Sequence, residues 1–130
     1  MKPVPETFTS FLLPQWREKH PEDEGYEIKI WDEDQVTALD FIHNRDVILD
    51  KELNPALRAD FLRIELLHHF GGLYADVDMT CEQNIFTSLS LLFNSSQFSF
   101  ITGLSNTQAF EINNGILLSK VGSPFAAYLI

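Results

Sequence analysis

Residues 54–78 constrain the fold of this chain more than any other stretch, because they predict a helix, a glycine break and a strand. Asn54 followed by Pro55 is a good helix start, with the asparagine as N-cap and the proline at the first helical position. Gly71 suits the left-handed conformation that ends many helices. Between these ends, apolar residues recur at helical spacing: Leu57, Phe61, Leu62, Ile64, Leu66, Leu67 and Phe70. The sequence therefore predicts a buried helix over 55–70 that leads into a strand over 73–78.

The predicted strand ends in two aspartates that alternate with apolar residues. In a strand, every second residue points to the same side, so Tyr74, Asp76 and Asp78 would share one face. Two ionised carboxylates about 7 Å apart repel by about 2 kcal/mol at an effective dielectric constant of about 20. A divalent cation removes this repulsion, and oxygen ligands with room for water and phosphate favour Mg²⁺ or Mn²⁺ over zinc. Taken alone, an Asp-x-Asp tripeptide also fits the solvated end of a strand.

Two charged residues on the predicted helix are candidates for the same site. Asp60 and Arg63 are three residues apart and lie on neighbouring parts of one helix face. They fit a surface ion pair, but apolar residues on both sides place them at the rim of the core, where a ligand could complete them. His68 and His69 fall in the last turn, where histidine compensates the helix dipole, so they are left out of the candidate site.

The rest of the chain alternates helical and strand patterns. The other predicted elements are a helix over 5–19 with a kink or boundary at Pro14, a strand over 26–31, a helix over 34–44, and strands near 97–102 and 111–118. With 130 residues, 45% of them hydrophobic, the chain is long enough for one domain with its own core. This alternation predicts an α/β fold with a layered sheet.

Charge and cysteine content argue against several other functions. The formal net charge of −10 argues against nucleic acid or an anionic membrane surface as a partner. Cys81 is the single cysteine, so no intrachain disulfide can form and a small buried thiol is expected. No apolar run in this chain reaches the roughly 20 residues that a membrane span requires.

Residues 58–78, which read RADFLRIELLHHFGGLYADVD, resemble the central motif of the glycosyltransferases with a DxD sugar-binding region. This family includes fungal initiating mannosyltransferases, inositol-phosphoceramide mannosyltransferases and the glucosylating domains of clostridial toxins. The similarity continues in GYEIKIWD at 25–32, which resembles the family's second strand, and in INNGI at 112–116 with SPF at 123–125. The resemblance implies a GT-A-like (Rossmann-like) layered sheet that binds a nucleotide sugar, with flanking helices, incomplete at both ends.

The resemblance also implies roles for six residues. It assigns Asp76 and Asp78 to a divalent cation, Mn²⁺ or Mg²⁺, held against the diphosphate of a nucleotide sugar. It assigns four residues to the donor sugar: Asp60, Arg63, Tyr74 and Asn114. Asp60 and Arg63 would contact sugar hydroxyls, which a carboxylate and a guanidinium are suited to fix. On the residues alone, Asn114 within Asn-Asn-Gly fits a turn equally well.

The implied reaction transfers a hexosyl group (mannose, glucose or galactose) from GDP-mannose or a UDP-hexose to a glycan, glycolipid or protein acceptor. Family members begin with a strand of the form Ile-Pro-Lys-x-Ile-His and end with a portion that contacts the acceptor. Residues 1–130 would then be a single partial catalytic domain that lacks both, and could be inactive by itself. The sequence does not fix a location. The full-length enzyme would be expected in the Golgi or associated with a membrane if it is eukaryotic, and in the cytoplasm if it is bacterial.

Two alternatives remain open. Residues 76–80, Asp-Val-Asp-Met-Thr, fit the first motif of haloacid-dehalogenase-type Mg²⁺-dependent phosphatases, and residues 99–103 resemble the second. Against this, that first motif follows a strand of four or five apolar residues, and the helix with Asp60 and Arg63 has no role in that chemistry. The chain could also be a non-catalytic relic of the transferase fold. Metal-dependent binding of a nucleotide sugar separates these possibilities.

Overall fold

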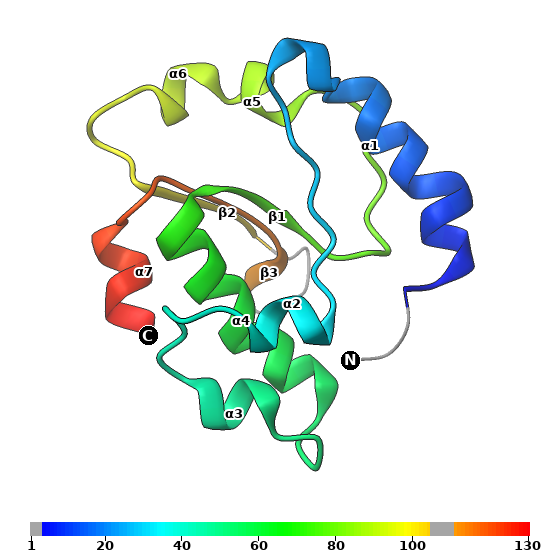
Figure 1. Ribbon diagram of the computed structural model, residues 1–130. Coiled ribbons are helices and arrows are strands. Elements are labelled where there is room, and N and C mark those ends of the chain that lie inside the picture. Colours follow the sequence, from blue (N-terminus) through cyan, green and yellow to red (C-terminus); the bar gives the residue numbers. More distant parts are fainter. Residues whose placement is uncertain (1–3, 105–110) are drawn as a thin grey trace.

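The computed structural model describes residues 4–104 and 111–130, which form a mixed structure of helices and strands (Figure 1). In chain order, the elements are a π-helix η1 (Phe8–Leu12), α1 (Leu13–Lys19), a 3₁₀-helix η2 (Glu22–Glu24), α2 (Glu33–Thr37), α3 (Arg45–Leu49), α4 (Pro55–Phe70), β1 (Gly72–Ala75), α5 (Ile85–Ser88), α6 (Ser90–Phe93), β2 (Phe100–Leu104), β3 (Ile112–Ser119) and α7 (Pro124–Leu129). Within these residues, no helix has the length and apolar composition needed to cross a membrane.

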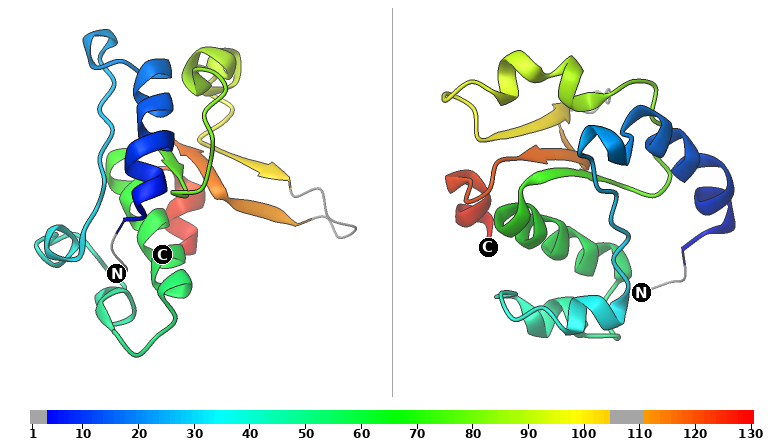
Figure 2. Two further views of the ribbon diagram at one scale, coloured as in Figure 1. Left: turned by 90° about the vertical axis from the view of Figure 1, so that its right-hand side faces the viewer. Right: turned by 45° about the horizontal axis from the view of Figure 1, so that its top comes forward.

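The three strands form an open antiparallel sheet in the order β1-β3-β2. Tyr74 of β1 and Thr102 of β2 both pair with Leu117 of the central strand, so these three side chains share one face. α4 contacts β1 and β3, and Figure 2 shows the β2–β3 hairpin extending away from the helices. The predicted mixture of helices and strands is confirmed, as are the two late strands. The sheet, however, is small and not clearly Rossmann-like, unlike the larger layered sheet that the resemblance implied.

The central helix α4 has the bounds that the sequence predicts. The Asn54 side chain accepts the Ala56 N–H at 2.9 Å and caps the first turn. At the other end, the Gly71 N–H donates to the Leu67 carbonyl at 2.9 Å, and Gly71 has a φ of 67°. A side chain at this glycine would be strained, and its Cβ would also meet the Val121 nitrogen at 2.8 Å. The glycine is therefore needed for the passage from α4 into β1.

The face that α4 buries is more polar than its apolar pattern predicts. Three charged side chains of α4 are buried: Arg58, Arg63 and Glu65. Leu57 and Phe70, which were expected in the core, are exposed. Two of these charges have partners from neighbouring segments: Arg58 Nε donates to the Ile48 carbonyl of α3 at 2.7 Å, and Glu65 accepts the backbone N–H groups of residues 43 and 44 at 2.6 and 2.7 Å. The apolar part of the core is the cluster Val36, Ile42, Ile48, Leu62 and Leu66.

The predicted strand over 26–31 is wrong. These residues pair with no strand among the described residues. Ile28 and Ile30 pack instead against a cluster from the first helical segment: Phe8, Leu12 and Leu13. Alternating apolar residues can thus be buried against a helix as well as within a sheet.

The predicted helix over 34–44 is too long, because α2 ends at Thr37. The backbone N–H groups of residues 43 and 44 donate to Glu65 and are not available for helical bonds. The first helix is closer to its prediction: a π-helix passes into α1 with Pro14 in its first turn, which confirms the predicted boundary. Cys81 is buried as predicted, and burial raises the pKa of its thiol.

The strand that carries the aspartates is shorter than predicted. β1 ends at Ala75, and the Met79 N–H donates to the Asp76 carbonyl at 3.1 Å to close a turn over residues 76–79. Asp78 therefore lies in a turn and not on the strand face that carries Tyr74. Aspartate favours turns over strands, which accounts for this early end.

Candidate functional site

The buried guanidinium of Arg63 joins residues from α4, β1 and β3. Its Nη2 lies 3.0 Å from Asp60 Oδ1 and its Nη1 lies 3.5 Å from Asp76 Oδ1. Nη1 also donates to the Asn114 carbonyl, and the Arg63 Cζ lies 4.5 Å from the centroid of the Tyr74 ring. Arg63, whose side chain is only 5% exposed, is therefore in contact with four of the other five residues expected in the site.

Asp76 has one oxygen engaged by its neighbours. The Tyr74 hydroxyl donates to Asp76 Oδ1 at 2.6 Å, on the same oxygen that faces Arg63. Burial, and then this hydrogen bond, raise the pKa of Tyr74 above its ordinary value. The predicted alternation of Tyr74 with Asp76 is thus confirmed as a direct contact, and Tyr74 is a stable hydrogen-bond donor at neutral pH.

Asn114 lies within β3, so the interpretation of Asn-Asn-Gly as a turn is wrong. The pairing of β2 with β3 jumps from Thr102↔Leu117 to Gly103↔Asn113, which leaves residues 114–116 of β3 without partners in β2. This irregularity sends the Asn114 side chain toward α4, where its Nδ2 donates to Asp60 Oδ1 at 3.0 Å. Bulges of this kind re-aim side chains next to functional sites.

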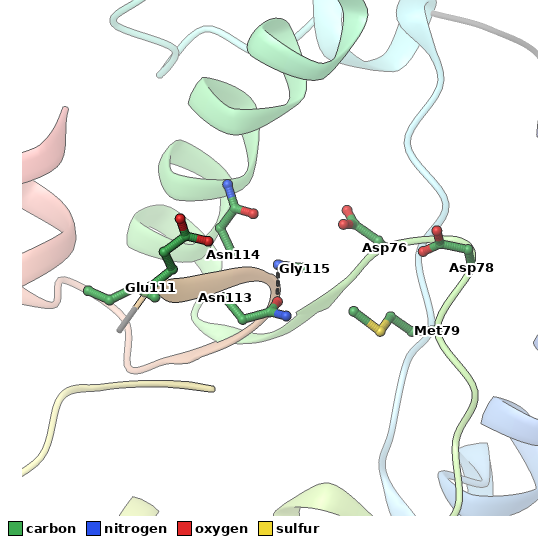
Figure 3. Close-up of a pocket in the computed structure, with 8 residues that line it drawn as sticks. Asp76, Asp78, Met79, Glu111, Asn113, Asn114 and Gly115 are labelled. Carbon is green, nitrogen blue, oxygen red and sulfur yellow. Dashed lines mark hydrogen bonds between the residues drawn. The ribbon is translucent and has the colours of Figure 1, made fainter. Parts of the chain in front are cut away.

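A cavity of about 320 Å³ lies beside this network. Its lining residues come from the turn after β1 and from the start of β3: Asp76, Asp78, Met79, Glu111, Ile112, Asn113, Asn114 and Gly115. In Figure 3, Asp76, Asp78 and Met79 lie on one side of Gly115, and Glu111 lies on the other. A Cβ at Gly115 would meet Met79 Cε at 2.6 Å and Asp76 Oδ2 at 3.0 Å, so the glycine keeps the second oxygen of Asp76 accessible.

The two carboxylates fit a divalent cation that also takes ligands from a substrate. Asp76 Oδ2 borders the cavity, and the Asp78 side chain makes no ion pair or hydrogen bond with another described residue. Within residues 4–104 and 111–130, no three His, Cys, Asp or Glu side chains gather closely enough to hold a metal ion. Two carboxylates leave coordination positions for water and phosphate, as Mg²⁺ and Mn²⁺ sites do. The donor set therefore suits such an ion bound together with a phosphate ligand.

Five residues that line the cavity are not among the site residues predicted from the sequence: Met79, Glu111, Ile112, Asn113 and Gly115. Asn113 and Gly115 stand in the Asn-Asn-Gly run, and their polar and small character was a signal that pointed to a turn. Asn113 Oδ1 accepts the Gly115 N–H at 2.8 Å, which stabilises the irregular backbone of β3. Nothing in the sequence marks Glu111 or Met79.

Comparison with known proteins gives a consistent result. The family model described as glycosyltransferase sugar-binding region containing DXD motif matches residues 9–98. An uncharacterised glycosyltransferase of Acanthamoeba polyphaga mimivirus is 30% identical over 111 residues, which cover 81% of this chain and 41% of that protein. The chain thus spans about two fifths of the length of this curated relative. No solved structure matches the chain. The matched residues include α4 and the turn with Asp76 and Asp78, and end before β3.

Proposed function

The chain belongs to the family of glycosyltransferases with a sugar-binding region containing the DXD motif, and we propose that it binds a nucleotide-diphosphate sugar and takes part in transferring its hexosyl group to an acceptor. This proposal rests on a cluster of contacts around Arg63. Four residues contact its guanidinium: Asp60, Tyr74, Asp76 and Asn114. The cluster lies beside a cavity that Asp78 also lines. In this proposal, the chain forms the donor-binding part of a GT-A-like domain. Its match to the viral relative covers 41% of that protein, which agrees with such a partial domain.

Asp60 and Asn114 are the proposed contacts to the donor sugar. The Asp60 side chain is 43% exposed, and its Oδ1 is held by both Arg63 and Asn114. Its Oδ2 can accept hydrogen bonds from sugar hydroxyls. Arg63 is too buried, and too fully engaged, to reach the sugar with several donors, because Nε also donates to the Ala59 carbonyl at 3.2 Å. We therefore assign Arg63 to holding Asp60 and Asp76 in place.

Asp76 and Asp78 are the proposed residues for Mn²⁺ or Mg²⁺. Four carboxylates and one guanidinium stand in or beside the cavity: Asp60, Asp76, Asp78, Glu111 and Arg63. An excess of negative charge would repel a diphosphate, so a cation is needed for the donor to bind. When bound, a divalent cation supplies charge compensation for the departing nucleoside diphosphate. Tyr74 remains protonated and orients Asp76 through its hydroxyl.

The donor and acceptor are proposed at the level of chemical class. The donor is GDP-mannose or a UDP-hexose, and the acceptor is a glycan, glycolipid or protein. We also propose that the chain is related to the fungal mannosyltransferases, and that the protein is located in the Golgi as a consequence. Both proposals rest on the motif over 58–78. The phosphatase alternative finds no support in the family match, which includes the helix with Asp60 and Arg63.

The test is calorimetric titration with UDP- and GDP-sugars in the presence and absence of Mn²⁺. We expect one nucleotide sugar to bind only with Mn²⁺, and binding to be lost in Asp76→Ala/Asp78→Ala. A matched control, Asp23→Ala/Glu24→Ala, removes the same charge from the exposed η2 and should bind as the wild type does. A folded chain that binds no nucleotide sugar, or a double variant at 76 and 78 that binds as well as the wild type, would contradict the proposal.

A further inference from the structure

The segment that follows the two aspartates is attached to α1 at both of its ends. Near its start, the indole Nε1–H of Trp16 donates to the Met79 carbonyl at 2.9 Å. Near its end, the Ile85 N–H donates to Nε2 of His20 at 3.2 Å, and Asn84 Nδ2 donates to the Lys19 carbonyl at 2.9 Å. Helix α1 is therefore hydrogen-bonded to the turn over residues 76–79, which carries the two aspartates. Trp16 and Met79, which make one of these bonds, are 63 residues apart in the sequence.

Two of the side chains that make these bonds, Trp16 of α1 and His20 directly after it, pack against each other. Trp16 and His20 are buried, and their rings stack with centroids 5.6 Å apart and an interplanar angle of 22°. Because His20 Nε2 accepts the Ile85 N–H, the ring proton lies on Nδ1, which is 3.2 Å from the Trp16 carbonyl. The indole is thus fixed in the orientation that reaches Met79.

Asp78 depends on this attachment because its side chain has no other support. Within the part of the chain that the structure describes, its carboxylate makes no ion pair or hydrogen bond. Its backbone leaves the sheet after Asp76, which is held by the Gly115 carbonyl at 2.8 Å. The next fixed point is Met79, whose N–H donates to the Asp76 carbonyl and whose carbonyl accepts from Trp16. Asp78 is therefore aimed by the residues on either side of it.

We propose that Trp16 is a positioning residue for the cation site, which holds the turn so that Asp78 faces the cavity with Asp76. This inference rests on the proposed function, since it concerns the same two carboxylates. Groups that orient a metal ligand are part of the affinity of the site, because a ligand that must first be ordered binds more weakly. Trp16 acts through a backbone carbonyl, so its removal should weaken the site without abolishing it.

The first test is Mn²⁺ titration of Trp16→Phe, which keeps an aromatic ring beside His20 and removes the N–H donor. We expect the Kd for Mn²⁺ to rise about five-fold, as for the loss of one neutral hydrogen bond. The matched control is Trp31→Phe, the same substitution at a tryptophan whose ring stacks on Phe70, the last residue of α4. This control should bind Mn²⁺ as the wild type does. Equal affinity in both variants and the wild type would overturn the proposal.

The second test is amide hydrogen exchange at Met79, which needs no metal. In Trp16→Phe this amide should exchange about five-fold faster, and in Trp31→Phe at the wild-type rate. If Trp16→Phe does not fold, the Trp16 indole is replaced by its benzothiophene analogue, which keeps the ring shape without the N–H. Unchanged exchange, or faster exchange with unchanged Mn²⁺ affinity, would overturn the role of Trp16. A wild-type chain that binds no Mn²⁺ would overturn the proposed function, while exchange at Met79 still decides whether Trp16 holds the turn.

Discussion

Arg63 should be the residue whose loss affects both stability and the candidate site most. Arg63→Met keeps the apolar stem of the side chain but removes the ion pairs to Asp60 at 3.0 Å and to Asp76 at 3.5 Å. Hydrogen bonds to charged groups contribute about 1.5–3 kcal/mol each. The Asp60 and Asp76 side chains are 43% and 36% exposed, so water screens both pairs and the lower figure applies. The free energy of unfolding should fall by about 3 kcal/mol.

Urea unfolding followed by tryptophan fluorescence measures this loss, with a midpoint about 2 M lower for an m-value of about 1.5 kcal/mol/M. Arg63→Lys should fall between the variant and the wild type, because one ammonium cannot serve both carboxylates and the Asn114 carbonyl. Arg58→Met is the matched control: it is equally buried on α4, so it should lose stability but leave nucleotide-sugar and Mn²⁺ affinity unchanged. A loss below about 1 kcal/mol for Arg63→Met, or a fully stable Arg63→Lys, would refute the central role of the guanidinium.

Two further predictions concern the cavity and its tyrosine. Gly115→Ala should weaken Mn²⁺ binding, measured by calorimetry, by roughly ten-fold or more, because its Cβ would meet Met79 Cε at 2.6 Å and Asp76 Oδ2 at 3.0 Å. Gly103→Ala on β2 is the matched control, because its Cβ would make only ordinary contacts at 3.8 and 4.0 Å. An equal loss of Mn²⁺ affinity in both variants would count against the cavity as the cation site. The pKa of Tyr74 is raised in the folded state, so above pH 10.0, the ordinary pKa of tyrosine, the unfolded chain loses a proton that the folded chain keeps. The contribution of Tyr74 to the free energy of unfolding is therefore complete below pH 10.0 and declines as the pH rises above it. The absorbance rise at 295 nm between about pH 9.5 and 11 should therefore be the same in the wild type and Tyr74→Phe, whereas a smaller rise in Tyr74→Phe would show that Tyr74 titrates normally.

The parts of the fold that sequence predicts well are those fixed by neighbouring residues. The bounds of α4 follow from Asn54 and Gly71, which act through the backbone next to them. The ion pair of Asp60 with Arg63 follows from helical spacing in the same way. The family, too, was identified from the motif over 58–78, which lies within the residues that the family model matches.

The parts that sequence missed depend on contacts between distant segments. Glu65 accepts the backbone N–H groups of residues 43 and 44, so these groups form no helical hydrogen bonds. No local sequence pattern predicts this contact. Likewise, Asn114 reaches Asp60 only because β3 leaves its register with β2 after Asn113. In both cases a polar side chain takes a backbone N–H group: Glu65 binds those of residues 43 and 44, and Asn113 Oδ1 accepts that of Gly115. Short-range propensities do not describe such contacts.

The two aspartates of the motif are chemically alike but stand in different surroundings, and this difference orders their roles. Asp76 gives one oxygen to Tyr74 and Arg63 and has its backbone N–H bound to β3, so it belongs to the fold as well as to the cavity. Asp78 has no such ties and is supported only through the backbone of Met79. A carboxylate shared with a guanidinium has part of its charge compensated, whereas one without a partner keeps its full charge for a cation. At the proposed cation site, the fixed aspartate would therefore define where the cation binds, and the aspartate without a partner would supply most of the attraction.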